Sequence, residues 1–286
     1  MTNSIEIHGL RKSYPDFTLG DIDLTLPGGS IMGLIGENGA GKTTTIKCIL
    51  NLVRLDAGSI TVMGHDSVRE ERLAKADTGV VLDECFFHDS LRPRDADGIL
   101  SRAYPAWDSQ LYRRYLEKFK LPEQKYVKEF SRGMKMKLSL AAALSHRPKL
   151  LILDEATAGL DPVVRDEILD EFLAFISDEE HSILISSHIT SDLEKVADYI
   201  TYIHQGQVAL SGAKDEILER YGRMACAAVQ LEGVDPADLV RVRRGEFGCE
   251  ALVADRAAFA QKYPGLLVER ATLEEIMLFI GKGEAK

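Results

Sequence analysis

The chain has 286 residues, of which 45% are hydrophobic and 28% are charged, and its net charge is −10. This length allows one large domain or two smaller ones, and the apolar content is enough for a real core. The negative charge argues against a general nucleic-acid binder, which needs a basic face.

The apolar runs along the chain have the length of strands. Leu150–Leu153 and Ile183–Ile185 are examples, and no run approaches the ~20 apolar residues of a membrane span. The N-terminus is polar and has no signal-peptide pattern. We therefore expect a chain that neither crosses a membrane nor is secreted. The scattered cysteines form no C-x-x-C pair, which predicts reduced thiols at Cys48, Cys85, Cys226 and Cys249.

The first predicted elements are strands that surround a glycine-rich segment. Residues 21–26 alternate between polar and apolar side chains, which indicates a half-buried strand. The apolar run Ile31–Ile35 predicts a second strand, and Thr44–Leu52 forms a helix-favouring stretch. Between these two lies a match to G-x-x-x-x-G-K-[ST], made of Gly36, Glu37, Asn38, Gly39, Ala40, Gly41, Lys42 and Thr43.

This segment has the pattern of a phosphate-binding loop between a strand and a helix. Its glycines let successive backbone N–H groups point at phosphate oxygens, and the following helix presents its positive end to the same anion. Lys42 can reach the β- and γ-phosphates, and the Thr43 hydroxyl can ligate Mg²⁺. We expect Thr44, the next residue, to belong to the same nucleotide site.

Strands and helices then alternate along the chain, interrupted by a helical stretch. Short strands are predicted at residues 60–63 and 79–82, and helices over about residues 90–147. After that, strand 150–153, helix 163–176, strand 183–186 and helix 190–197 follow one another. Parallel strands need crossover helices, so this order predicts an α/β core with a helical insertion.

The core pattern ends near Tyr221, which predicts a main domain over residues 1–221 and a small α+β appendage over residues 222–286. Strands are predicted there at 228–231, 250–253 and 267–269, and Thr272 begins a capping box for a last helix ending at Ile280. Acids and bases nearly balance in this tail, which argues against nucleic-acid binding. The three arginines of residues 241–244 are interpreted as exposed charge, and a dimer-stabilising or regulatory role is a hypothesis.

Three polar residues follow the later core strands. Asp154 ends a buried strand, where its carboxylate can hold Mg²⁺ near Thr43. Glu155 comes next and can activate water as a general base, which ATP hydrolysis needs. His188 follows another strand, at the sheet edge where phosphates bind, and is a candidate contact to the γ-phosphate.

With these motifs the chain resembles the ATP-binding cassette of ABC transporters over residues 4–220. The resemblance implies a P-loop NTPase core with a mixed sheet, an antiparallel β subdomain and a helical insertion. It also implies that Ser131 and Gly133, in the signature segment Phe130–Met134, bind ATP held by an opposite subunit. By the same resemblance Asp161 lies in a dimer-contact loop and Tyr14 stacks on adenine.

Three residues depart from the family pattern. Arg132 stands where glycine is usual, and an arginine could supply charge in place of a close backbone approach to phosphate. Ala156 replaces a proline after the catalytic glutamate. Asp83 replaces a glutamine, and we expect it to ligate Mg²⁺ or a water differently.

Further stretches, such as Tyr104–Asp108 and Ser186–Leu193, resemble the ATPase subunits of bacterial ABC-2-type exporters of peptides and antibiotics. This resemblance implies two cassettes, identical or paralogous, that bind ATP and Mg²⁺ between them. It implies a separate membrane permease, docked near Phe86, Phe87 and Leu91 unless these residues are ordinary core. The chain is then expected in the cytoplasm, peripheral to the cytoplasmic face of the membrane. An importer subunit, a non-transport cassette ATPase and a P-loop kinase or GTPase are the alternatives.

A basic block lies inside this acidic chain, between Arg113 and Lys137. It is interpreted either as a solvated helical face or as a surface that contacts anionic lipid beside the permease.

Overall fold

The structure is a computed structural model that describes residues 2–245 and 248–282. The chain forms two compact units, Met1–Val208 and Ala209–Lys286. The boundary lies within strand β10 (Gln207–Ala213), earlier than the position after residue 221 that the sequence suggests. Helix α8 (Lys214–Arg220) contacts helix α10 (Arg256–Lys262), and this contact assigns α8 to the second unit.

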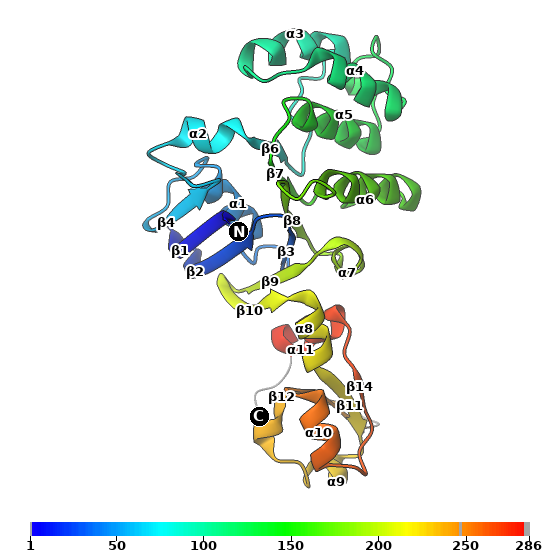
Figure 1. Cartoon of the computed structure of the whole chain (residues 1–286). Helices are drawn as coiled ribbons and strands as arrows, with labels where there is room; N and C mark the ends of the chain where they lie inside the picture. The colour runs from blue at the N-terminus through cyan, green and yellow to red at the C-terminus, as the bar shows by residue number, and fades with distance from the viewer. Residues whose placement is uncertain (1, 246–247, 283–286) are drawn as a thin grey trace. The chain divides into compact units, whose positions relative to one another are not determined.

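An antiparallel sheet begins the first unit, with strand order β2-β1-β4-β5 (Figure 1). Its strands are β1 (Asn3–Tyr14), β2 (Phe17–Pro27), β4 (Ala57–Val62) and β5 (His65–Asp66). The alternation predicted for β2 is confirmed, because Ile22, Leu24 and Leu26 are buried and the polar residues between them are exposed. Strand β1 was not predicted, because a register shift between Ile7 and Leu10 interrupts its alternation.

The central sheet has the order β10-β9-β3-β8-β7-β6, and β9, β3, β8, β7 and β6 are mutually parallel. Its further strands are β3 (Ile31–Ile35), β6 (Thr78–Val81), β7 (Leu150–Asp154), β8 (Ser182–Ser187) and β9 (Tyr199–His204). Every residue of β3, β7 and β8 is buried. Such strands need cover on both faces, which explains their continuous apolar runs. The parallel core predicted from the sequence is therefore confirmed.

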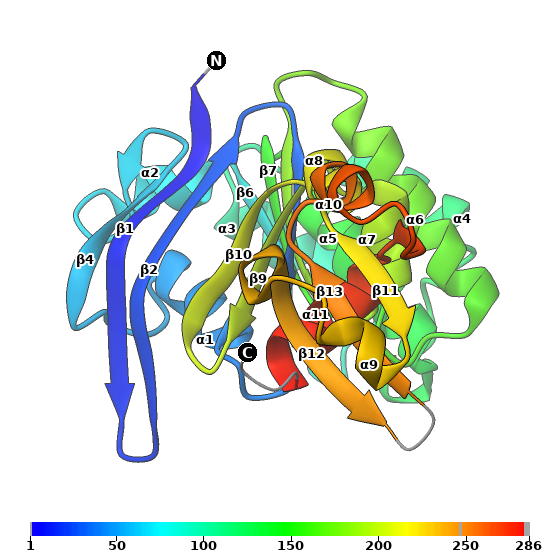
Figure 2. The same cartoon turned by 90° about the horizontal axis from the view of Figure 1, so that it is seen from below.

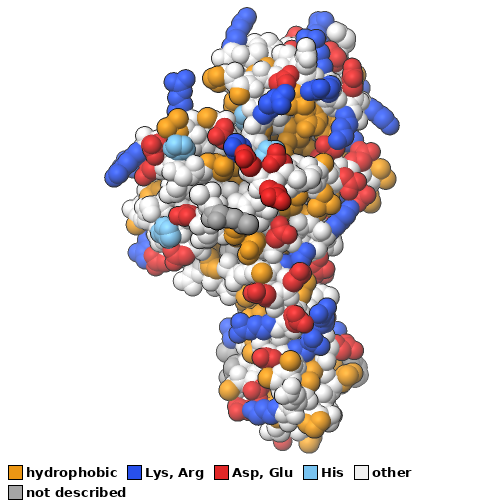
Figure 3. Space-filling model, in the orientation of Figure 1, with side chains coloured by type: hydrophobic (Ala, Val, Ile, Leu, Met, Phe, Trp, Pro, Cys, Tyr) orange, Lys and Arg blue, Asp and Glu red, His pale blue; other side chains and the backbone are white. Residues whose placement is uncertain are grey.

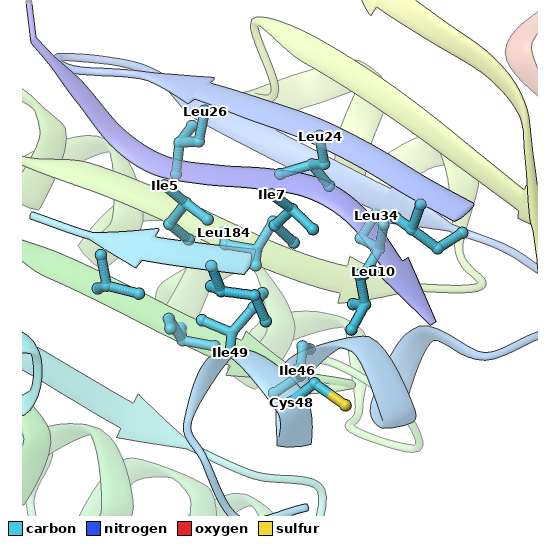
Figure 4. Close-up of a cluster of buried hydrophobic side chains, with 14 of the residues drawn as sticks. Ile5, Ile7, Leu10, Leu24, Leu26, Leu34, Ile46, Cys48, Ile49 and Leu184 are labelled. Atoms are coloured by element: carbon cyan, nitrogen blue, oxygen red, sulfur yellow. The ribbon is translucent and has the colours of Figure 1, made fainter. Parts of the chain in front are cut away.

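Helix α1 (Lys42–Ile49) contacts β4 of the antiparallel sheet and β7 of the central sheet, and Figure 4 shows its Ile46, Cys48 and Ile49 in a buried cluster. Ile46 and Ile49 of this helix join the buried cluster that contains Ile7 of β1 and Leu34 of β3. The cluster holds α1 in place, and the loop that leads into it is therefore attached to a rigid core.

Helices cover the opposite face of the central sheet. Figures 1 and 2 show α5, α6 and α7 on one side and the antiparallel sheet on the other. The helices of this unit beyond α1 are α2 (Glu71–Ala76), α3 (Pro93–Ala103), α4 (Ser109–Lys118), η1 (Val127–Glu129), α5 (Arg132–Leu144), α6 (Pro162–Ile176) and α7 (Thr190–Val196). The segment from α3 to α5 matches the helical insertion expected over residues 90–147.

The second unit is built on an antiparallel sheet of order β12-β13-β11-β14. Its strands are β11 (Gly222–Cys226), β12 (Leu239–Gly245), β13 (Gly248–Val253) and β14 (Val268–Arg270). Its further helices are α9 (Ala228–Leu231), η2 (Pro236–Asp238) and α11 (Leu273–Lys282). Met224, Ala251 and Phe259 are central to its own core.

One prediction for this unit is wrong. Residues 228–231 form the short helix α9 and not a strand, because the Gln230 side chain accepts a hydrogen bond from the Ala227 N–H and closes a helical turn. The capping box is confirmed: the Thr272 hydroxyl accepts from the Glu275 N–H at 3.2 Å, and a Glu275 carboxylate oxygen accepts from the Thr272 N–H at 2.9 Å.

The four cysteines are free thiols, as the sequence predicts. None of the helices in the described part of the chain has the length and apolar character that a membrane crossing requires.

Candidate functional site

Three parallel strands end side by side and bring the predicted residues together. Ile35 at the end of β3 pairs with Ser187 of β8, and Asp154 at the end of β7 pairs with Ser186 of the same strand. The glycine-rich loop, Glu155 and His188 each follow directly after one of these strand ends. In an open parallel sheet, ligands bind outside the carboxyl ends of the strands.

The loop between β3 and α1 has the form of an anion cradle. Gly41 has a φ of 117°, and a Cβ there would lie 2.7 Å from Leu19 Cδ1, so that only glycine fits. No side chain caps the start of α1. Its first N–H groups are therefore available to an anionic ligand, as the phosphate-loop prediction requires.

Lys42 lies at the centre of this site. Its Nζ donates to the carbonyl oxygens of Gly36 at 2.7 Å and Glu37 at 3.3 Å, and it lies 3.2 Å from Glu155 Oε1. The side chain is only 5% exposed. Its charge therefore lies inside the loop, where a phosphate would take the place of some of these oxygens.

Glu155 is held between two cationic or polar partners. Its Oε1 faces Lys42, without the alignment of a hydrogen bond, and its Oε2 lies 2.7 Å from His188 Nδ1. The Glu155 backbone has a φ of 51°, an unusual value for a residue other than glycine, and its N–H donates to Ser186 O at 3.1 Å. Strained backbone of this kind gathers at functional sites. The arrangement aims one carboxylate into the loop.

The residues expected to hold Mg²⁺ fit a hard cation. Asp154 is 1% exposed, and its Oδ1 accepts a hydrogen bond from the Ser186 hydroxyl. Thr43 lies half-buried in the first turn of α1. An anionic carboxylate with an orienting hydroxyl and a nearby threonine is the donor set that Mg²⁺ takes in phosphate-loop proteins. Ser186 itself was not among the predicted site residues.

Asp83, the third predicted metal ligand, follows β6, which lies beyond β7 in the sheet. It is exposed and lines a hollow with Arg132 and Lys135. Within the described residues, neither a hydrogen bond nor an ion pair joins it to Thr43 or Asp154.

The signature residues lie at a helix start. Ser131 is the N-cap of α5, and its Oγ accepts from the Met134 N–H at 3.3 Å. It is exposed, whereas a Cβ on Gly133 would lie 3.1 Å from Val164 Cγ1 of α6. Asp161 is the N-cap of α6, where its Oδ1 accepts from the Val164 N–H at 3.1 Å. Two helix starts therefore lie together and open to solvent.

Tyr14, the predicted adenine contact, ends β1 with a 42% exposed ring. Lys12 Nζ lies 5.6 Å from the centre of that ring. Across the hairpin, Phe17 pairs with Tyr14, and its Cζ would lie 3.1 Å from a Cβ on Gly41. The sequence analysis missed Phe17, although its place opposite Tyr14 in a Pro-Asp turn was a usable signal.

Known proteins resemble this chain in sequence and in fold. The sequence profile described as "ABC transporter" matches residues 19–158. The linearmycin resistance ATP-binding protein LnrL of Bacillus subtilis (strain 168) is 32% identical over 245 residues, which are 84% of this chain and 78% of that protein. The lantibiotic transport ATP-binding protein SrtF of Streptococcus pyogenes is 36% identical over 214 residues, which are 74% and 91% of the two chains.

A solved structure of an ATP binding subunit of an ABC transporter has a TM-score of 0.68 and 27% identity, and the match covers 74% of this chain and 91% of that one. The chain therefore belongs to the ABC transporter family, as one of its ATP-binding, ATP-hydrolysing subunits.

Proposed function

We propose that this chain hydrolyses ATP with Glu155 as the general base and drives an exporter for peptides or antibiotic-like amphipathic compounds. One observation carries the catalytic part. The Glu155 carboxylate lies between Lys42 Nζ, at 3.2 Å, and His188 Nδ1, at 2.7 Å, directly beside the phosphate-binding loop. A base in that place can take a proton from water that attacks the terminal phosphate.

The roles of the other residues follow from their positions. Lys42 and the free N–H groups at the start of α1 would hold the phosphates of ATP, and His188 would contact the γ-phosphate. Asp154 and Thr43 would hold Mg²⁺, which neutralises charge on the transferred group when it is bound. The rings of Tyr14 and Phe17 offer the adenine of ATP a flat apolar surface next to Gly41.

A second cassette would complete the site. Ser131 and Asp161 are exposed at two neighbouring helix starts, where an anion on another subunit gains from both helix dipoles. In this proposal ATP joins two copies, or this chain and a paralogue, and its hydrolysis releases them. The closed and open forms are then the two states of a ligand-driven switch.

The export part rests on relatives and on one surface. The relatives named above act in linearmycin resistance and lantibiotic transport, and a bacitracin transport ATP-binding protein of Enterococcus faecalis is 35% identical over 208 residues. A largely apolar hollow lined by Phe86, Phe87 and Leu100 lies between β6 and the helical insertion. A permease segment that docks there would place this chain at the cytoplasmic face of the membrane. Phe86, which is 73% exposed, supports docking over ordinary core packing.

The proposal also includes a contact between the helical insertion and anionic lipid. Figure 3 shows many basic side chains over the helical insertion. However, Arg113, Lys118, Lys135 and Lys137 are in ion pairs with Asp97, Glu171, Asp89 and Glu167. A solvated, paired face is the simpler interpretation, and vesicle flotation decides between them: equal binding to anionic and neutral vesicles would exclude the lipid contact.

The substitution Glu155→Gln tests the catalytic claim. It should leave ATP binding unchanged, lower turnover by about 10²–10⁴-fold and trap an ATP-dependent dimer on size-exclusion chromatography. Glu180→Gln, which changes an exposed carboxylate outside the site, is the matched control. Turnover of the Glu155 variant within a few-fold of wild type would exclude Glu155 as the base.

A further inference from the structure

Arg132 occupies the first position of α5, directly after Ser131. It is exposed, and its guanidinium makes no hydrogen bond or ion pair with any residue in the described part of the chain. Its position relative to Gly159 is nevertheless specific. A Cβ built on Gly159 would lie 2.9 Å from Nη1, 3.2 Å from Cζ and 3.5 Å from Nε of Arg132. The guanidinium therefore lies against the side of Gly159 that has no side chain.

Gly159 belongs to the loop that joins Glu155 to Asp161. This loop has a φ of +66° at Gly159, and it is closed by the bonds from Ala158 N–H to Glu155 O at 3.0 Å and from Leu160 N–H to Thr157 O at 3.4 Å. The second of these bonds is long, so the turn has little support of its own. A planar guanidinium packed on this backbone restricts the loop from outside.

Two further contacts join the same pair of elements. Gly133 packs against Val164, and Lys137 forms an ion pair with Glu167, so that α5 and α6 are in contact along their first two turns. Arg132 extends this contact beyond the start of α6 into the loop. The helix start that carries Ser131 and the loop that begins at Glu155 are thereby linked within one subunit.

We propose that Arg132 is a positioning residue that holds the Glu155–Asp161 loop against the start of α5. The guanidinium acts through Gly159, where the φ of +66° favours glycine and where a Cβ would displace the end of the Arg132 side chain. The consequence rests on the proposed function. The contact fixes the position of Glu155 relative to Ser131, which faces the second nucleotide. Less conformational entropy is therefore lost when ATP brings two subunits together.

The first experiment measures the contact itself. Amide hydrogen exchange of Ala158 and Leu160 is compared in the wild-type chain, Arg132→Ala and Arg132→Lys. Loss of the guanidinium should speed exchange of both amides by about 3–10-fold, with lysine intermediate, since contacting groups are usually coupled to this extent. Arg114→Ala, which removes a charge from α4, is the matched control and should leave both amides unchanged. Equal exchange in the Arg132→Ala and wild-type chains would overturn the inference.

The second experiment measures the consequence, in the Glu155→Gln background. Arg132→Ala should raise the ATP concentration for half-maximal dimerisation several-fold, while the Kd of the single chain for ATP stays the same. Gly159→Ala should have a similar effect, and adding Arg132→Ala to it should cause little further loss, because the guanidinium is already displaced. Backbone strain from Gly159→Ala is present in both the single and the double variant, so it cancels when the two are compared.

The outcomes separate this inference from the proposed function. The inference would be overturned if Arg132→Ala left amide exchange unchanged and if the effects of Arg132→Ala and Gly159→Ala on dimerisation were fully additive. That result would assign the guanidinium to a direct contact with phosphate. Normal dimerisation of Arg132→Ala together with faster exchange would overturn the proposed consequence. If no Glu155→Gln dimer forms at all, the proposed function fails, and the exchange measurement still decides whether Arg132 holds the loop.

Discussion

At the scale of single residues, the site is defined by charged groups that are buried or partly buried with a partner. Lys42 is almost fully buried, donates hydrogen bonds to two carbonyl oxygens and forms an ion pair with Glu155. Removing one partner of a buried pair leaves an uncompensated charge, which is strongly destabilising. We therefore expect the Lys42–Glu155 pair to contribute to the stability of the loop between β3 and α1.

His146 is the one buried imidazole in the described part of the chain, and it predicts a pH effect. It is 2% exposed, its Nε2 lies 3.2 Å from Thr78 O and its ring stacks on Tyr104. Burial lowers the pKa of His146 below its ordinary value of 6.5. Below pH 6.5, His146 is therefore protonated in the unfolded chain before it is protonated in the folded chain. The stability that the neutral residue contributes is present above pH 6.5 and is lost as the pH falls below that value.

Chemical unfolding at pH 7.5 and pH 5.5 checks this effect. The wild-type chain should lose more stability between these conditions than His146→Gln, which has no proton to gain. His8→Gln, a change at an exposed histidine, should behave like the wild-type chain. An equal loss in the His146 variant and the wild type would contradict the prediction.

At the scale of elements, the two exposed helix starts have two separable roles. Ser131 and Asp161 each accept a backbone N–H of their own helix, from Met134 and Val164. A lost cap costs about 1 kcal/mol of stability. The same side chains are expected to contact the second subunit, so that stability and dimerisation need separate measurements.

Substitutions at Asp161 separate these roles. Asp161→Ala should lower the free energy of unfolding by about 1 kcal/mol, whereas Asp161→Asn keeps a capping oxygen and should lower it by a few tenths at most. Urea unfolding of both variants measures the difference. If the asparagine variant is as unstable as the alanine variant, the carboxylate has a structural partner other than the cap.

The elements also explain which parts of the fold the sequence predicts. The buried strands β3, β7 and β8 each contain a short apolar run and were predicted within one or two residues. Strand β12 was missed, because a register shift between Leu239 and Arg241 breaks the alternation and its arginines read as exposed charge. Helix α9 was misassigned because a four-residue segment with three apolar residues fits a strand as well as a helical turn.

The candidate site was predictable where residues adjoin a motif in the sequence. The loop residues and the Asp154–Glu155 pair follow directly from their neighbours. The contacts of Ser186 with Asp154, of Phe17 with Gly41 and of Arg132 with Gly159 join positions far apart in the chain. Such contacts depend on strand order and helix packing, which no local pattern contains.

At the scale of the whole molecule, the unit boundary within β10 predicts how the chain tolerates truncation. Helix α8 carries Ile217, which is 5% exposed, and Tyr221 follows with 9%. Both belong to the second unit. A chain that ends after Tyr221 keeps these residues without their surroundings and exposes them to water, whereas a chain that ends after Ala213 does not.

Light scattering and melting of the two truncated chains measure this difference. The chain ending after Ala213 should stay monodisperse and melt cooperatively. The chain ending after Tyr221 should bind more of a hydrophobic dye and aggregate at lower temperature. The opposite order would place the true end of the first unit after α8.

In the proposed dimer, one ATP is held from two sides, by the loop that carries Lys42 in one subunit and by the start of α5, at Ser131, in the other. This arrangement is tested by mixing an untagged Glu155→Gln chain with a tagged Lys42→Ala chain and adding an ATP analogue with a photoreactive group on the γ-phosphate. We expect label on the tagged chain within residues 130–134, although that chain cannot hold the analogue alone. Label confined to the untagged chain would contradict it.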